Sequence, residues 1–135
     1  MKKKFSKKWL SSKQPRKQRK YRYNAPLHLR KKFISTHLSK QLQGLYKTRA
    51  FPLRKGDTVK VMRGNFKNKT AKVTSIETKK IKVYLEGLQK TRKDGTKVNV
   101  QFNPSNLLIT ELNLEDKERL KSLDRRKLKN KISKQ

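Results

Sequence analysis

Hydrophobic residues recur with a helical period in residues 24–46. They follow one another at spacings of seven, four, four and three, which puts them on one stripe of an α-helix. Asn24 and Pro26 precede the stripe as a helix start, with Asn as N-cap and Pro in the first turn, and Gly44 is a candidate stop. The pattern predicts a basic amphipathic helix over residues 24–46. Its stripe comprises Leu27, Ile34, Leu38, Leu42 and Leu45.

Residues 53–112 alternate apolar and polar positions with a period of two, which places each apolar set on one face of a β-strand. Glycine-containing turns such as Gly56-Asp57 separate the sets. Five short strands within about 60 residues favour a small closed barrel, because closure leaves few free sheet edges. The sets are Val59 with Val61, Ala71 with Val73, Ile81 with Val83 and Leu85, Val98 with Val100 and Phe102, and Leu107 with Ile109.

The two ends of the chain have a different composition. The N-terminal stretch is poor in apolar residues and dense in Lys, Arg, Gln and Ser, which predicts an extended arm that is disordered when free. From Asn113 the pattern is helical again, with acidic residues first and basic residues last, as the helix dipole favours. We therefore predict a mainly β protein with flanking helices, in four segments. They are a basic extended arm (1–23), a basic amphipathic helix (24–46), a barrel (53–112) and a C-terminal helix and tail (113–135).

Positive charge dominates the composition. Forty Lys and Arg stand against nine Asp and Glu in 135 residues, so the formal net charge is +31 and the pI is about 10.9. No acidic residue precedes Asp57, whereas nineteen Lys and Arg do. Self-repulsion of this size calls for a polyanionic partner, and nucleic acid fits best because each contacted phosphate releases counterions. A hydrophobic content of 31% supports only one small domain with basic extensions.

Other classes of protein fit the sequence poorly. No run approaches the roughly 20 apolar residues of a membrane-spanning helix, and we expect neither membrane insertion nor a signal peptide. The absence of Cys excludes disulfides and suits a reducing cytoplasm. His28 and His37 lie nine positions apart, too far for one metal site on a helical face. No nucleotide-binding or hydrolase motif occurs, so we expect no enzyme, no cofactor and no small-molecule substrate.

Residues 53–87 carry the most specific motif of the chain. The turn at Gly56-Asp57 leads into a first strand, and the loop from Arg63 to Lys69 projects its bases from one end of the barrel. This strand-loop-strand segment resembles the KOW motif of ribosomal and transcription-elongation proteins, which implies an SH3-like five-stranded barrel. That motif usually has glycine where Asn68 and Ala71 stand here. Asn often adopts the left-handed backbone conformation, whereas Ala rarely does. Ala71 is therefore expected to hinder a close approach of the loop to RNA.

The N-terminal half adds a second resemblance. The run Lys13–Tyr23, its continuation to Lys32, the turn Asp94-Gly95-Thr96 and the segment Asn103–Asn106 are similar to the large-subunit ribosomal protein twenty-four family, in its archaeal and eukaryotic branch. The resemblance extends from about residue 11 to about residue 128. It implies a structural constituent of the cytoplasmic large ribosomal subunit. Family members bind the 5′ domain of large-subunit rRNA early in assembly, near the mouth of the peptide exit tunnel, among neighbouring large-subunit proteins.

Candidate RNA contacts come from the arm, the helix, the motif loop and one turn. Lys and Arg can contact phosphates, Tyr rings can stack on unpaired bases, and Asn can reach sugars or base edges. Other interpretations stay open. The loop lysines could simply be solvated, and the charge run of the arm could be solvated or serve as a targeting signal. The two tyrosines could pack against the following helix. The candidates are Lys13, Arg16, Lys17, Arg19, Lys20, Tyr21, Arg22, Tyr23, Arg30, Lys31, Lys32, Arg63, Asn65, Lys67, Asn68, Lys69, Arg92 and Lys93.

Two other functions remain possible from the sequence. A KOW-domain transcription-elongation factor would carry a second domain that grips the polymerase, for which the length leaves no room. A small SH3-like chromatin protein would have a compact body without a long arm. The arm and the helix that starts near Pro26 favour recognition of folded RNA by phosphate contacts and shape.

Overall fold

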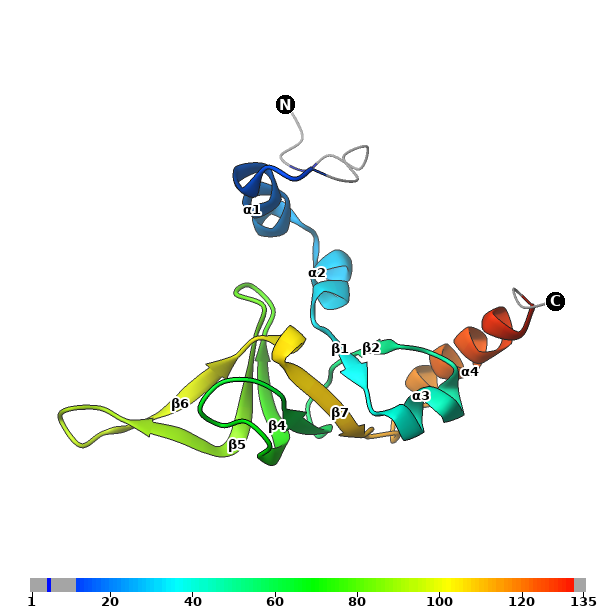
Figure 1. Cartoon of the computed structure of the whole chain (residues 1–135). Coiled ribbons are helices and arrows are strands. Elements are labelled where there is room, and N and C mark those ends of the chain that lie inside the picture. Colours follow the sequence, from blue (N-terminus) through cyan, green and yellow to red (C-terminus); the bar gives the residue numbers. More distant parts are fainter. Residues whose placement is uncertain (1–4, 6–11, 133–135) are drawn as a thin grey trace.

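The computed structural model describes residue 5 and residues 12–132, with side chains as far as Arg125. A seven-stranded sheet forms the body, and four α-helices flank it (Figure 1). The prediction of a mainly β protein with flanking helices is confirmed. The strands are β1 (Ser35–Leu38), β2 (Ala50–Pro52), β3 (Thr58–Val61), β4 (Thr70–Glu77), β5 (Lys82–Thr91), β6 (Lys97–Phe102) and β7 (Leu107–Glu111). The helices are α1 (Pro15–Asn24), α2 (Leu27–Phe33), α3 (Lys40–Tyr46), the 3-10 turn η1 (Pro104–Asn106) and α4 (Lys117–Ile132).

The sheet has the strand order β2-β1-β7-β3-β4-β5-β6. Strands β3 to β7 are the five that the period-two alternation predicts, and neighbours among them pair antiparallel. The first part of β4 pairs with β3 and its last part with β5, with a register shift between Val73 and Ser75. Strand β1 extends the sheet by pairing parallel with β7 and antiparallel with β2. The sequence pattern did not predict β1 or β2.

The single helix predicted over residues 24–46 is wrong. The segment contains two short helices, α2 and α3, with strand β1 between them. Thr36 is β-branched, favours extended backbone and is buried in β1, while Ile34 is the C-cap of α2 and is buried in the core just before the strand. Ser39 then starts α3 as its N-cap, because its hydroxyl accepts a hydrogen bond from the Leu42 backbone N–H at 3.4 Å.

The prediction of an extended arm over residues 1–23 is wrong for residues 15–23, which lie in α1. Pro15 stands in the first turn, where its fixed φ suits a helix, and the Arg, Lys and Gln residues that follow are good helix formers. Apart from residue 5 and residues 12–14, the earlier part of the predicted arm lies outside the described residues.

Helix α4 starts later than the sequence suggested. Its N-cap is Asp116, whose carboxylate accepts a hydrogen bond from the Glu118 backbone N–H at 2.8 Å. Asn113, the predicted cap, instead closes a turn by accepting a hydrogen bond from the Glu115 backbone N–H at 3.0 Å. The helix runs to Ile132 and so includes the start of the predicted tail, whose last three residues lie outside the described part. The division into four segments itself stays a prediction.

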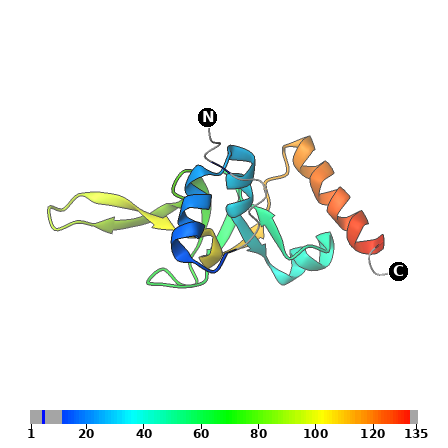
Figure 2. The ribbon, with the colours of Figure 1, turned by 90° about the horizontal axis from the view of Figure 1, so that it is seen from above.

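One hydrophobic core joins the strands to the added elements. It reaches from β1 and β2 across the sheet to β5 and β6, and Leu123 of α4 is fully buried in it. Viewed from above, the hairpin of β5 and β6 projects away from this body on the side opposite α4 (Figure 2). The core comprises Ile34, Leu38, Phe51, Leu53, Val59, Val61, Val73, Val83, Leu85, Leu88, Phe102, Leu107, Ile109 and Leu123.

A buried ion pair attaches α4 to the start of β3. Asp57 is fully buried and Arg119 is 3% exposed, and two guanidinium nitrogens donate to the two carboxylate oxygens at 2.6 and 2.7 Å. Backbone N–H groups of Arg54 and Asn113 donate to the same carboxylate, so each of its oxygens accepts two hydrogen bonds. Arg119 also donates to the carbonyls of Asn113 and Pro52. This bidentate arrangement fixes how α4 lies on the sheet.

Candidate nucleic-acid interface

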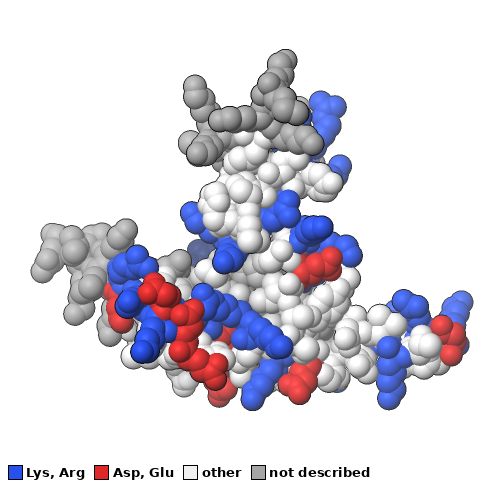
Figure 3. Space-filling model, turned by 180° about the vertical axis from the view of Figure 1, so that it is seen from behind, with Lys and Arg blue, Asp and Glu red and all other residues white. Residues whose placement is uncertain are grey.

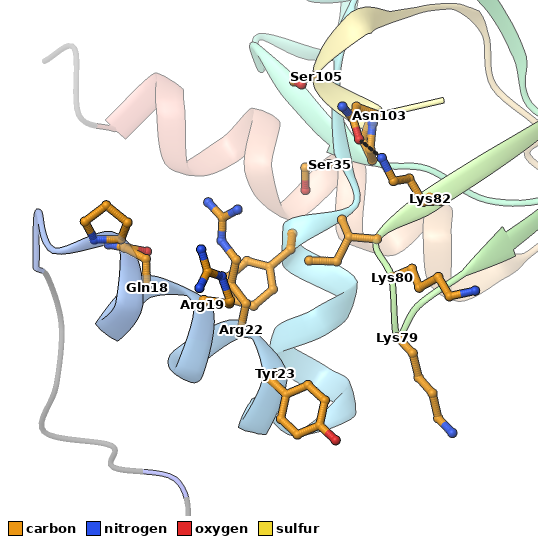
Figure 4. Close-up of a pocket in the computed structure, with 14 residues that line it drawn as sticks. Gln18, Arg19, Arg22, Tyr23, Ser35, Lys79, Lys80, Lys82, Asn103 and Ser105 are labelled. Atoms are coloured by element: carbon orange, nitrogen blue, oxygen red, sulfur yellow. Dashed lines mark hydrogen bonds between the residues drawn. The ribbon is translucent and has the colours of Figure 1, made fainter. Parts of the chain in front are cut away.

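A cleft of about 750 Å³ opens between α1 and the turn that joins β4 to β5. Arg19 and Arg22 come from α1, Lys79 and Lys80 come from the turn, and Lys82 follows at the start of β5 (Figure 4). Among the described residues, no Asp or Glu lines the cleft. Two cationic elements that are distant in sequence therefore face each other across a space suited to a polyanion.

Most of these charges have no acidic partner among the described residues. Lys80 forms an exposed ion pair with Glu77 at 3.2 Å, whereas the Lys82 ammonium donates to the neutral Asn103 amide oxygen at 2.7 Å. Within the described part of the chain, Arg19, Arg22 and Lys79 have no carboxylate within 4 Å. Four of the five bases can therefore neutralise a bound anion without first breaking an ion pair to a described residue.

Contacts between α1 and α2 set the position of the cleft's first wall. The Arg30 guanidinium donates to the Tyr23 carbonyl at 2.7 Å, which fixes the end of α1. The Tyr21 ring lies 6.2 Å from the Phe33 ring, centroid to centroid, in an edge-on arrangement. Tyr21 thus packs against the following helix, which was one of the two interpretations of the sequence. Tyr23 is 79% exposed and lines the cleft.

The predicted motif loop is anchored beside η1. Phe66 packs edge-on against the buried Phe102, with ring centroids 5.9 Å apart, and the Met62 N–H donates to the Asn106 carbonyl at 2.8 Å. The candidates Arg63, Asn65 and Lys67 are exposed on the loop. Because Pro104 and Ser105 of η1 line the cleft, the loop and the cleft adjoin the same turn.

The two positions where the KOW motif usually has glycine behave differently. Asn68 has a φ of 68°, so it occupies the left-handed backbone space that glycine would take, and its N–H donates to the Val61 carbonyl at 2.8 Å. Ala71 lies outside the loop, in β4 opposite Val59. Lys69 holds its ammonium 5.3 Å from the Phe66 ring centroid.

Arg92 and Lys93 are exposed in the turn between β5 and β6 and are not among the residues that line the cleft. The hairpin that carries this turn projects from the body (Figure 1). Asp94 closes this tip by accepting hydrogen bonds from the Thr96 hydroxyl at 2.7 Å and the Thr96 N–H at 3.0 Å. These bonds, the hydroxyl first, lower the pKa of Asp94. The tip is therefore an ordered basic surface separate from the cleft.

The remaining candidates lie on α1 and α2, except Lys13, which precedes α1. Lys17 and Lys20 are exposed on α1, and Lys31 and Lys32 are exposed on α2, whereas Arg30 is half-buried and bonded to Tyr23. The structure thus brings the α1 bases, η1 and the motif loop to one region and leaves the hairpin tip apart.

Sequence reasoning missed the lysines of the β4–β5 turn. Lys79, Lys80 and Lys82 follow one another closely between two predicted strands, and that run was the available signal. On the face shown in Figure 3, acidic and basic residues are mixed over the described first part of α4, while the hairpin tip is mainly basic.

The described residues contain no group of three or more metal-ligating side chains that could hold an ion. The two histidines lie on different elements, His28 on α2 and His37 on β1. No helix in residues 12–132 is long and apolar enough to cross a membrane.

Comparisons with known proteins all match the chain to one family of ribosomal proteins. The profile of the family described as the eukaryotic ribosomal proteins L26 and their archaeal L24 counterparts matches residues 12–126. The large ribosomal subunit protein uL24 of Methanosphaera stadtmanae is 44% identical over 115 residues, which cover 85% of this chain and 98% of that protein. Its counterpart in Methanothrix thermoacetophila is 47% identical over 114 residues, with 84% and 98% covered.

Proposed function

This chain belongs to the family of ribosomal proteins that comprises eukaryotic L26 and its archaeal L24 counterparts, and on that premise we propose that it binds large-subunit rRNA. Its family makes it a protein of the cytoplasmic large ribosomal subunit, with a structural rather than a catalytic role. That agrees with the assignment made from sequence resemblance. The family favours this assignment over the elongation-factor and chromatin-protein alternatives.

The observation that carries the RNA proposal is the cleft between α1 and the β4–β5 turn. Five bases and no described acidic residue line it, and four of the bases have no acidic partner among the described residues. Such a surface contacts phosphates, which supply most of the affinity of basic proteins for nucleic acid. The candidate residues of α1, α2, the motif loop and the hairpin tip extend this surface.

The proposed target is the 5′ domain of large-subunit rRNA, bound early in assembly and near the mouth of the exit tunnel. A protein that binds early must recognise rRNA in the absence of other subunit proteins. Its positive charge then replaces counterions along folded RNA, and its loops follow the shape of the RNA rather than a linear sequence.

We also propose that β3 to β7 form a small SH3-like barrel, with α1, α2 and α4 as attached segments. Three features support this. Strand β4 is shared between two halves of the sheet, β3 pairs with the last strand β7, and the 3-10 turn η1 joins β6 to β7. Such closure leaves fewer exposed edges, which limits aggregation of a chain with so small a core.

Binding to protein-free rRNA tests the function directly. The purified chain is titrated with a transcript of the 5′ domain and with an unrelated structured RNA of equal length, at several salt concentrations. We expect tighter binding to the 5′ domain at every salt concentration, because the chain recognises its folded shape. Equal affinity for the two RNAs would contradict the proposed function, because the chain would then bind polyanions in general.

A further inference from the structure

We infer that the cleft between α1 and the β4–β5 turn holds one RNA strand by its phosphates and stacks an unpaired base on Tyr23. This rests on the proposed function and adds to it a binding site that joins predicted residues of α1 to turn lysines that the sequence did not reveal. The ligand is thus a single-stranded or bulged segment rather than a blunt duplex.

Opposed charges define the path of the strand. Arg19 and Arg22 are three residues apart on α1, so their side chains share one helical face. Across the cleft, Lys79 and Lys82 add two cations without an acidic partner among the described residues. In Figure 4 the Lys79 and Lys80 side chains extend away from α1 and Lys82 turns toward Asn103. These side chains are long and flexible, so a phosphate backbone between the walls can be neutralised from both sides once the lysines turn toward it.

The turn that carries the lysines is strained. Ile81 has a φ of 56°, a left-handed conformation that β-branched residues rarely adopt. It is half-buried against the hydrophobic core, so packing holds it there. Strain of this kind persists where the surroundings impose it and is concentrated at functional sites. Here the strained residue separates Lys80 from Lys82 and lines the cleft.

Tyr23 supplies the surface for a base. It lies at the end of α1, lines the cleft and is 79% exposed, more than any other large hydrophobic side chain in the described part of the chain. In Figure 4 its ring lies at the edge of the cleft and is turned away from the guanidinium groups of Arg19 and Arg22. An exposed aromatic ring at the edge of a cationic cleft offers a surface on which an unpaired base can stack while its phosphates enter the cleft.

The first test compares two variants with the same loss of charge. The cleft variant carries Lys79→Gln, Lys80→Gln and Lys82→Gln. The matched control carries Lys40→Gln, Lys72→Gln and Lys117→Gln, all exposed lysines outside the cleft. The probes are an RNA hairpin with a single-stranded extension and a blunt hairpin, and thermal unfolding verifies that both variants fold.

On the extended hairpin, the cleft variant should lower the slope of log affinity against log salt by about two, as expected for three lost single-strand phosphate contacts. The control should keep a slope close to that of the wild type. Equal slopes for the two variants would overturn the inference. The proposed function would stand, because it depends on the separate preference for the 5′ domain.

The second test concerns the base. Tyr23→Leu should reduce the preference for the extended over the blunt hairpin by about tenfold, within the range measured for loss of one stacked base, whereas Tyr23→Phe should retain it. If Tyr23→Leu left the preference for the extended hairpin unchanged, Tyr23 would not stack on a base of the bound RNA. Acetylation of amines in the complex gives an independent readout: Lys79 should be protected by the RNA and Lys72 should not.

Discussion

At the residue scale, Asp57 shows how a local sequence signal can hide a long-range role. Beside Gly56 it looks like an ordinary turn residue, and the turn does form. Its carboxylate, however, is fully buried and binds Arg119, which lies in a helix near the other end of the chain. No periodicity links the two positions, because the pairing exists only after the sheet and α4 have packed together.

Breaking this pair should be costly. Asp57→Ala leaves the Arg119 guanidinium buried without a counter-charge, so the free energy of unfolding should fall by about 3–5 kcal/mol. Urea denaturation measures the change. The control Asp124→Ala removes an exposed carboxylate of α4 and should shift the free energy by no more than about 0.5 kcal/mol. Equal effects of the two changes would contradict a structural role for the buried pair.

Asn68 permits a second prediction at this scale. Its φ of 68° is tolerated by Asn and glycine but strains Ala, so Asn68→Ala should destabilise the protein by about 1–2 kcal/mol. Asn68→Gly, the residue usual in the KOW motif, should be close to neutral. Thermal or urea unfolding of the two variants provides the measurement. If Ala were tolerated as well as Gly, the left-handed backbone at this position would be in error.

At the element scale, α4 is held at its start by charge as well as by its cap. The Arg54 side chain donates to the Asp116 carboxylate, and the Glu118 N–H donates to it as well. These hydrogen bonds, Arg54 first, lower the pKa of Asp116 below its ordinary value. A carboxyl whose pKa is depressed by folding stabilises the folded state above its unfolded pKa, and that contribution is lost as the pH falls through the folded value.

Asp116→Asn should therefore destabilise the protein at neutral pH and have progressively less effect below about pH 4. Asn keeps a capping oxygen, so the substitution tests the charge and not the cap. Urea unfolding of wild type and variant across this pH range measures the difference. Lys72→Gln, which changes an exposed cation without an ion pair among the described residues, serves as the control and should show no such pH trend. If the difference in unfolding free energy between wild type and Asp116→Asn stayed the same at low pH, the Asp116 charge would not be the stabilising feature.

Elements with a clear local period were predictable, and others were not. Strands β3 to β7 could be predicted because alternate residues face the core. Strand β1 was interpreted as helix because its last residue, Leu38, lies four positions after Ile34, the C-cap of α2, which is the spacing that a helical stripe requires. The β-branched residues in this stretch were the contrary signal. The cleft could not be predicted from the sequence, since α1 and Lys79 meet only through tertiary packing.

At the scale of the whole molecule, basic surfaces lie in two places. The cleft and the motif loop adjoin η1, while Arg92 and Lys93 lie at the end of a hairpin that projects from the body (Figure 2). A protein of this shape can contact two segments of folded RNA at once.

Because the cleft and the hairpin tip lie apart, substitutions in the two surfaces should have additive effects on RNA binding. Arg92→Gln with Lys93→Gln should lower the salt dependence of binding to the 5′-domain transcript by about one to two units of slope, and should add to the loss caused by the cleft variant. Filter binding across a salt series measures each slope. A hairpin variant that bound like the wild type would show that the tip does not contact that RNA.

The central claim is that this chain is an integral rRNA-binding protein of the large subunit. Sedimentation of the tagged protein from lysate through sucrose gradients, at moderate and at high salt, tests it most directly. We predict co-migration with the large subunit that survives the high-salt wash, because many phosphate contacts and a docked core act together. Release by high salt, or migration with DNA or polymerase, would contradict the claim and leave a loosely bound nucleic-acid module.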